Sequence, residues 1–445
     1  MPVIPVQYES LKAILSYMDP NTRFQISLRI PSISSLERRL PLKIVNLKFS
    51  KTGIEVNGAR YRLGVYPHSK DNNVSSKIQM SMLPISHDID EYGYTISPGI
   101  NTVLPGDVDL RREILRNSQN DTNRKERLLV QELEALNKKL VKHLNQEYTE
   151  HDKFKTCRYV EFQTRHCVIR NQIDSLQIAL EPFKHRRNNT KPAYTNGIQL
   201  TVTSQRRGLI QRIPYNKNLF EAMKILSATL FGKRNLIISV KNVTIDFHNY
   251  ILRFPVETKL RIQTLEILSW SASNFQKFSR IIDTSSFPLE RLTMKCNPNL
   301  SNFKHEIVKT ARILIIDKTT TITRPWMVLL RPWITILRNL TNRYLYMKNQ
   351  HRNESDEDYV DFISSWLENE RPVGTSWSGI MKEETVKRVL INLKMRPEVV
   401  AASDNYVELR VNASSSLQVY YKALQPSDFH SKWLLNWRVV RSKLE

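Results

Sequence analysis

Between residues 196 and 350 the sequence alternates strand-like runs with helix-like runs, and this alternation limits the chain to few architectures. Strands separated by amphipathic stretches are typical of parallel strands that are joined by helices. The strand positions Ile267, Leu292, Leu314 and Leu345 follow one another at intervals of 25, 22 and 31 residues. The strand-like runs are 198–203, 236–246, 265–269, 289–294, 311–317 and 343–347, and the helix-like runs are 219–231, 274–283, 302–309 and 325–340.

Leucine-rich repeats have units of about 20–29 residues, each with one strand, and the observed intervals fall near that range. We therefore predict a degenerate leucine-rich-repeat-like β/α array over residues 196–350. Because the spacing drifts and the consensus Asn is irregular, a compact α/β domain with parallel strands is the alternative.

The start of the chain is apolar and is broken by prolines, which predicts three short helices over residues 8–40. Leu11, Ile14, Leu15 and Met18 follow the i, i+3, i+4, i+7 spacing of one helix face. The pair Asp19-Pro20 ends that helix, because the residue before a proline avoids the helical conformation. Such a short module must bury its apolar face against its own chain or against another protein.

Residues 41–110 read as a β region. Asn57-Gly58 stands between two alternating runs, and this pair favours a type I′ turn because both residues tolerate positive φ. A hairpin is therefore expected there, followed by a long polar loop with short strands near residues 77–82.

Residues 122–147 predict a long helix, in which leucines repeat at spacings of four and three. This seam covers about two heptads, whereas a sustained coiled coil needs about 3–4. A helix docked on its own chain, an exposed linker helix and a dimer seam all remain open. A basic polar linker is expected at 182–195. The seam residues are Leu129, Leu133, Leu136 and Leu140.

The last part of the chain predicts an acidic helix, a second helix at 382–394 and a closing hairpin at 405–424. The whole is a mixed α+β or α/β protein: a three-helix module, a β-hairpin region, a long helix, a repeat-like β/α array and a C-terminal hairpin. The predicted segments are 1–40, 41–110, 111–195, 196–350 and 351–445.

Positive charge concentrates in the predicted array. Residues 196–350 hold 24 of the 67 basic residues and only 8 of the 43 acidic ones. Such an excess attracts acidic proteins, nucleic acid or anionic surfaces. Solvated strand edges of a repeat array would also look like this. We rank incidental basicity or an acidic protein partner ahead of nucleic-acid binding. The candidate basic surface comprises Arg206, Arg207, Lys233, Arg234, Arg253, Lys259 and Arg261.

Sequence signatures of catalysis and cofactor binding are missing. There are 11 glycines in the chain, and neither GxGxxG, GxxxxGK[ST], HExxH nor GxSxG occurs. Cys157, Cys167 and Cys296 form no CxxC pair and no even framework, which suits a reducing compartment. The most apolar late run, 326–337, is shorter than the roughly 20 residues that a membrane span needs. We expect a non-enzymatic intracellular protein, cytoplasmic or nuclear, without cofactor, metal, catalytic residues or membrane contact.

The stretch YESLKAILSYMDPNTRFQISLRIPSISSLERRLP, residues 8–41, resembles an F-box. F-boxes are three-helix modules that bind a small Skp-type linker protein, which joins them to a cullin–RING ubiquitin ligase. The resemblance implies that this module is a degenerate F-box and that the rest of the chain selects a protein target. The matching, partner-binding positions are Leu11, Ile14, Leu15, Met18, Asp19, Pro20, Phe24, Ile26, Leu28 and Ile33.

A longer resemblance adds PLKIVNLKF, YRLGVY beside the Asn-Gly turn, and the late motifs RPVGTSW and YVELRVNASSSLQVYY. In this order they are similar to a nematode-expanded family of uncharacterised F-box-like proteins. That family implies a degenerate F-box, a β-containing remainder and a target surface after about residue 196. A stand-alone binding or scaffold protein, whose first helices are its own core, is the alternative.

Overall fold

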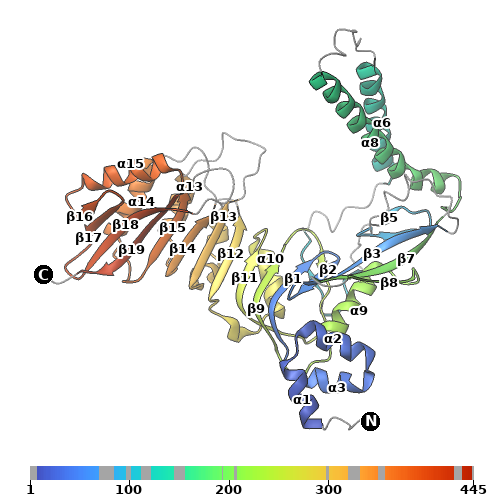
Figure 1. Cartoon of the computed structure of the whole chain (residues 1–445), viewed down its shortest axis with the longest axis horizontal. Coiled ribbons are helices and arrows are strands. Elements are labelled where there is room, and N and C mark those ends of the chain that lie inside the picture. Colours follow the sequence, from blue (N-terminus) through green and yellow to red (C-terminus); the bar gives the residue numbers. More distant parts are fainter. Residues whose placement is uncertain are drawn as a thin grey trace.

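One sheet of fifteen strands runs through the computed structural model of the chain (Figure 1). The structure describes residues 8–69, 85–96, 102–111, 122–144, 156–192, 194–204, 208–296, 300–318, 331–348, 356–424 and 433–442. From one edge to the other, the strands are β16 (Val399–Ser403), β17 (Tyr406–Arg410), β18 (Ser415–Ala423), β19 (Trp433–Arg441), β15 (Ser376–Met381), β14 (Tyr344–Lys348), β13 (Ile313–Lys318), β12 (Arg291–Cys296), β11 (Leu260–Ile267), β9 (Ile238–Ile245), β1 (Lys43–Ser50), β2 (Gly53–Val56), β3 (Ala59–Ser69), β7 (Tyr194–Thr203) and β8 (Gly208–Pro214).

Three short helices precede the sheet: α1 (Tyr8–Tyr17), α2 (Pro20–Arg29) and α3 (Pro31–Arg39). The Asp19 carboxylate accepts a hydrogen bond from the backbone N–H of Asn21 at 2.8 Å and so caps α2. A proline is the first residue of α2 and of α3, where the missing N–H costs nothing. The prediction of three helices over residues 8–40 is confirmed.

The antiparallel part of the sheet comprises β1, β2, β3, β7 and β8. Asn57 and Gly58 adopt φ values of 48° and 82° between β2 and β3, which confirms the predicted Asn-Gly hairpin. The Asn57 side chain also accepts hydrogen bonds from the N–H groups of Val45 and Asn46, at 2.9 and 3.0 Å. This turn therefore also holds β1 at Val45 and Asn46, two consecutive exposed residues that interrupt its alternation of buried and exposed side chains.

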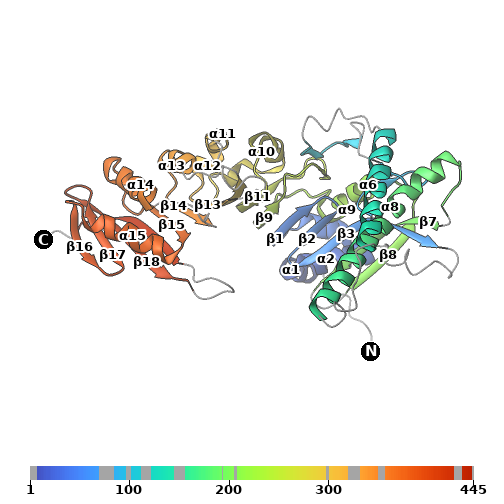
Figure 2. The ribbon, with the colours of Figure 1, turned by 90° about the horizontal axis from the view of Figure 1, so that it is seen from above.

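The parallel part runs from β1 through β9 and β11 to β15, and from β11 to β15 each strand lies beside the next one along the chain. Leu265, Leu292, Leu314 and Leu345 are aligned across four strands. The predicted repeat position Ile267 is instead aligned with Met294, one pleat away. The intervening helices, which lie along one side of the strands in Figure 2, are α10 (Ala272–Phe278), α11 (Leu300–Phe303), α12 (Glu306–Thr310) and α13 (Arg331–Arg338).

The C-terminal part adds four antiparallel strands and the helices α14 (Asp356–Glu368) and α15 (Glu383–Lys394). The predicted hairpin at 405–424 is present as β17 and β18. The prediction that it closes the array is wrong, because β19 lies between β18 and β15. Trp377 of β15 and Trp437 of β19 stack at 3.9 Å beneath Phe362 of α14, which makes this the largest aromatic cluster of the described core.

A two-helix hairpin projects from the sheet near β3 and β7 (Figure 1) and consists of α6 (Thr122–Leu144) and α8 (Thr156–Arg187). The leucine seam of α6 is half-buried, and Leu129 and Leu133 pack on the cluster of Tyr94, Leu180 and Phe183. The seam is thus covered by the same chain. Because α8 continues to Arg187, residues 182–187 are helical and not part of a linker.

The sheet crosses both boundaries of the predicted array segment 196–350. Strand β7 pairs with β3 and belongs to the antiparallel part, and β15 extends the parallel part beyond residue 350. The long helix α9 (Leu219–Phe231) matches its predicted bounds. Small sheets are formed by β6 (Val108–Asp109) with β10 (Ile251–Leu252), and by β4 (Asp88–Ile89) with β5 (Thr95–Ile96). The strands expected at 77–82 and the first six residues, 325–330, of the helix expected at 325–340 lie outside the described residues.

Replacing Trp437 with Ala removes a fully buried ring from this cluster. We expect the variant to lose about 3–5 kcal/mol of unfolding free energy, because Trp437 stacks on Trp377 and meets Phe362 and Trp366 edge-to-face, so its removal leaves a large cavity in the cluster. Urea unfolding followed by circular dichroism measures the loss. Tyr17→Ala is the matched control, since Tyr17 is 94% exposed and its removal changes stability by less than about 0.5 kcal/mol. Equal midpoints for the two variants contradict this account of the core.

Candidate functional site

The predicted partner-binding residues of the three-helix module are divided between its interior and its surface. Leu15 and Phe24 are 1% and 3% exposed, whereas Ile14 and Leu28 are 45% and 61% exposed. The remaining positions fall between these extremes. Pro20 is buried, and Leu11, Met18, Ile26 and Ile33 are half-buried.

The module has a small core of its own. Leu15, Leu36 and Leu40 form a separate buried cluster, against which Leu11 and Met18 pack from the side. No residue of a described strand belongs to this cluster. The apolar face of α1 is therefore used partly within the module, and the following strands do not enclose it.

Helix α2 attaches the module to the rest of the chain. Phe24 packs edge-to-face on Phe231 of α9, with ring centroids 6.3 Å apart. The Asn21 amide donates to the Val56 carbonyl at 2.9 Å and accepts from the Tyr61 hydroxyl at 2.9 Å. Burial raises the pKa of Tyr61 to about 12, with a further contribution from Asp19, so this hydroxyl stays protonated as a donor. Helix α1 is left on the outer side of the module (Figure 1).

A buried ion triad completes the attachment. Glu37 of α3 lies between Arg23 of α2 and Arg234, and all three side chains are 2–3% exposed. Arg23 and Arg234 donate to the Glu37 carboxylate at 3.1 and 2.8 Å, and Arg23 also donates to the Pro41 carbonyl at 2.7 Å. Burial lowers the pKa of both guanidinium groups, and Glu37 opposes that shift. The carboxylate thus holds two buried cations from distant segments.

The exposed apolar side chains of the module lie on α1 and around the end of α2. Ile14 is the i+3 neighbour of Leu11 and the i−4 neighbour of Met18, so these three side chains share one stripe of α1. Tyr17 continues the exposed side of α1, and Leu28 lies in the last turn of α2. The exposed set is Tyr8, Ile14, Tyr17, Leu28 and Ile30. We call Leu11, Ile14, Met18 and Leu28 the module surface.

The candidate basic surface is not one surface. Arg234 is buried in the ion triad, and Arg253 is 6% exposed and donates to the Asp107 carboxylate at 2.6 Å. The interpretation of these two arginines as surface residues is therefore wrong. Each is neutralised by a carboxylate that no sequence pattern pairs with it.

The other basic candidates lie at the surface or outside the described residues. Lys233, Lys259 and Arg261 are exposed. Lys259 donates to the Arg280 carbonyl, and Arg261 donates to the Ser285 hydroxyl at 2.9 Å. Arg206 and Arg207 lie outside the described residues.

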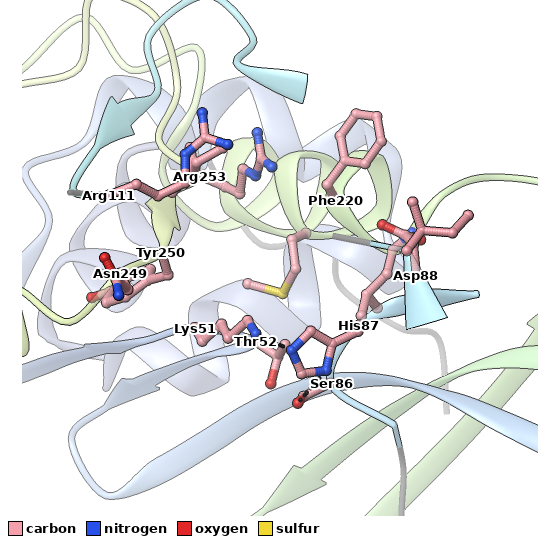
Figure 3. Close-up of a pocket in the computed structure, with 14 residues that line it drawn as sticks. Lys51, Thr52, Ser86, His87, Asp88, Arg111, Phe220, Asn249, Tyr250 and Arg253 are labelled. Carbon is pink, nitrogen blue, oxygen red and sulfur yellow. Dashed lines mark hydrogen bonds between the residues drawn. The ribbon is translucent and has the colours of Figure 1, made fainter. Parts of the chain in front are cut away.

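A cavity of about 310 Å³ lies between the β1–β2 turn, residues 86–88, α9 and β10 (Figure 3). Lys51 and His87 face each other at 2.5 Å on one side of it. Burial lowers the pKa of both side chains, and the charges of Lys51 and Lys125 lower that of His87 further. Asp88 accepts from the Tyr215 hydroxyl at 2.7 Å and from the backbone N–H of Leu219.

The arginines of this cavity are paired in the same way. Arg111 and Arg253 lie together on its other side (Figure 3) and bind Asp109 and Asp107 at 2.9 and 2.6 Å. The Asp88 and Asp107 carboxylates therefore link residues 85–96 and 102–111 to α9 and to Arg253, which follows β10. Sequence reasoning missed this cavity because its walls come from segments far apart in the chain, and no local motif marks them.

The described residues hold neither a metal-binding cluster nor a membrane-spanning helix. They contain no group of three or more His, Cys, Asp or Glu side chains that could hold a metal ion. Within the same ranges, no helix has both the length and the apolar character needed to cross a bilayer. Cys167 is exposed, and Cys296 is buried, which raises its pKa to about 12. The Cys157 side chain lies outside the described residues.

Comparison with known proteins gives one match. The family model described as a domain of unknown function (DUF3557) matches residues 218–383. No curated protein and no solved structure matches the chain. The matched region extends from the residue that caps α9 to the first residue of α15, and it contains all strands from β9 to β15. The match thus covers the parallel part of the sheet apart from β1.

Substituting Glu37 with Gln leaves Arg23 and Arg234 buried without a countercharge. We expect a loss of about 3–5 kcal/mol, the usual cost of breaking a buried ion pair. Hydrogen exchange of the α1–α3 amides and a urea melt both detect it. The triple variant Arg23→Met, Glu37→Leu, Arg234→Met is the control, because apolar replacement of the whole triad restores most of the stability. A Glu37→Gln protein as stable as the parent contradicts the assigned role.

Proposed function

We propose that this protein is a non-enzymatic intracellular adaptor. In this proposal the degenerate F-box-like module of residues 8–40 binds a Skp-type linker of a cullin–RING ubiquitin ligase. The leucine-rich-repeat-like array then presents a surface to a protein target. The observation that carries the proposal is the module surface, which the chain leaves accessible although the module itself is firmly attached.

The energetics of the module favour an interaction role. Ile14 and Leu28 are exposed although burying a side chain of this kind gains about 1.5–3 kcal/mol. The half-buried residues Leu11 and Met18, at i−3 and i+4 from Ile14, widen the apolar area along α1. A partner that covers this area supplies the burial that the three helices cannot supply themselves.

The architecture of the parallel part supports the repeat-like description. Each strand from β9 to β15 lies beside the next in sequence order, and helical segments return along one side. One aligned position per strand, Leu265, Leu292, Leu314 and Leu345, packs toward those helices. Arrays of this kind grow by one strand per unit and leave the other side of the sheet open to a ligand.

An adaptor must hold its two binding surfaces at a fixed separation. The ion triad and the Phe24–Phe231 contact bind the module to α9 and to the residues just before β9. The same β9 begins the array, so the module and the array share one rigid junction. This arrangement suits the presentation of a target to a ligase.

A stand-alone scaffold without a ligase link is the second candidate. It is favoured by Leu15 and Phe24, two matching F-box positions that the chain buries itself. Nucleic-acid binding through residues 196–350 is weakened, because Arg234 and Arg253 are already paired with carboxylates. Oligonucleotide binding that weakens steeply with rising salt concentration would support the nucleic-acid-binding alternative.

The adaptor proposal is tested with the double variant Ile14→Asp, Leu28→Asp and a purified Skp-type linker protein. Both side chains are exposed, so the variant folds, and titration calorimetry should show binding at least about tenfold weaker than for the parent. Ile391→Asp is the matched control, because Ile391 is 53% exposed on α15, far from the module.

Absence of binding by the parent protein favours the scaffold, as does equal binding by the parent and the double variant. Leu15 is unsuitable for this test. Its side chain is buried, and a charge there unfolds the module regardless of any partner.

A further inference from the structure

The C-terminal half of the sheet has one side without a helix in the part of the chain that the structure describes. On β14, β15 and β19 the side chains alternate between this open side and the helix side. Leu345, Trp377 and Trp437 point to the helix side and are 0–5% exposed. The residues between them are half-exposed or exposed, apart from Asn436, which is 7% exposed.

Strand register arranges the open side into two rows. Tyr344, Ser376, Arg438, Gln418 and Glu408 are successive neighbours across five strands. The next row runs parallel to the first and contains Tyr346, Ser378, Asn436, Tyr420 and Tyr406. The rows therefore combine tyrosine rings with hydroxyl, amide and guanidinium groups, a composition typical of protein-binding surfaces.

A hollow of about 440 Å³ lies within these rows. The hollow forms because β15 and β19 carry the small side chains Ser376, Ser378 and Asn436 between the larger tyrosine side chains of the adjacent strands. Tyr344 and Tyr420 stand on either side. The Asn436 side-chain amide oxygen accepts from the Ser378 hydroxyl at 2.7 Å, so the floor of the hollow is ordered.

Arginines surround this hollow. Arg438 and Arg441 line it, and the Arg438 guanidinium lies over the Tyr420 ring, 5.9 Å from its centroid. Arg343 approaches from the side of Gly374, which has a φ of +88°; a side chain at that position would have a Cβ 3.2 Å from the Arg343 guanidinium.

Free positive charge remains at the hollow. No Asp or Glu is among its described lining residues, and none of the ion pairs in the described part of the chain uses these three arginines. Arg438 does donate to the neutral Gln418 side chain at 3.0 Å, which positions its guanidinium.

We propose that this hollow binds a carboxylate-bearing segment, rich in Asp or Glu, of a protein partner. The planar guanidinium of Arg438 can donate two parallel hydrogen bonds to a carboxylate, and the Ser376 hydroxyl is placed to add a third. The tyrosines flank the site as rigid contact surfaces, which is how arginine and tyrosine act at the centre of protein interfaces.

The same side of the sheet disfavours a nucleic-acid ligand. Glu408 lies in the first row and accepts from Gln418 at 3.3 Å. Glu266 of β11 lies in the continuation of the second row and accepts from Thr244 at 3.0 Å. A track for a phosphodiester backbone needs uniformly positive charge, and these carboxylates interrupt it. Mixed charge with one arginine-rich hollow fits a protein surface better.

This inference deepens the proposed function, since it assigns the target-binding site to the far end of the array from the module. The probe is a fluorescein-labelled twelve-residue peptide that contains six Glu and Asp residues. Its binding to the full chain is followed by anisotropy at physiological salt. The second probe is the same peptide with Gln and Asn in place of the acids, and the third is a twelve-nucleotide oligothymidine.

We expect the acidic peptide to bind, and the amide peptide to bind at least tenfold more weakly. Arg438→Gln should weaken acidic-peptide binding at least tenfold. Arg438→Lys should bind the peptide with an affinity between those of the parent and Arg438→Gln, because lysine keeps the charge but cannot donate two parallel hydrogen bonds. Arg388→Gln should bind like the parent, because Arg388 lies on α15, on the helix side, with a side chain 59% exposed. Circular dichroism confirms that each variant is folded.

Several results overturn the inference: no binding of the acidic peptide, equal binding by the Arg438→Gln and Arg388→Gln proteins, or an Arg438-dependent complex with the oligonucleotide alone. The Ile14→Asp, Leu28→Asp protein separates this inference from the proposed function, since it should lose the linker and keep the peptide. If the parent protein binds the linker but not the acidic peptide, the proposal for the hollow is wrong and the adaptor proposal stands.

Discussion

The pairing of β1 with β9 makes this molecule one body. β1 binds β2 antiparallel on one side and β9 parallel on the other, with Ile44 opposite Val240 and Lys48 opposite Thr244. Without this seam the antiparallel strands near the N-terminus and the parallel array would be two separate sheets with two exposed edges each. The two strands are almost two hundred residues apart in sequence, so their backbone hydrogen bonds bring the start of the chain to the start of the array.

The three-helix module depends on the same seam. It precedes β1 directly, and its buried Glu37 binds Arg234, four residues before the first residue of β9. A buried ion triad adds little net stability compared with apolar packing, but it tolerates few geometries, because each charge must meet its partner. In this protein the triad fixes the orientation of the three-helix module relative to β9. The module surface at one end and the arginine-lined hollow at the other are held by one hydrogen-bonded framework, as the proposed adaptor requires.

Local sequence signals predicted much of this fold. Asn57-Gly58 specifies its turn through backbone conformation alone, and the predicted helix 219–231 has the bounds of α9 because its apolar spacing is a local signal. The repeat-like strands were visible for the same reason. Sequence reasoning did not identify α8 as the partner of Leu129 and Leu133. The signal is nevertheless local, because Ile169, Ile173 and Leu180 follow a matching helical spacing on α8.

The candidate site was less predictable because its features are long-range. Arg234 and Arg253 have the same local appearance as surface arginines, and only Glu37 and Asp107, more than one hundred residues away in sequence, make them structural. The hollow exists because β19 pairs with β15, and this pairing cannot be predicted from either strand alone.

The most direct measurement of the shared framework uses single-molecule energy transfer between dyes at Tyr17→Cys and Met395→Cys, with Cys157 and Cys167 replaced by Ser. Both labelling positions are exposed, one on α1 and the other just beyond α15. One narrow efficiency that persists until global unfolding is predicted, whereas a broad or divided distribution in native buffer would show that the module and the array move independently.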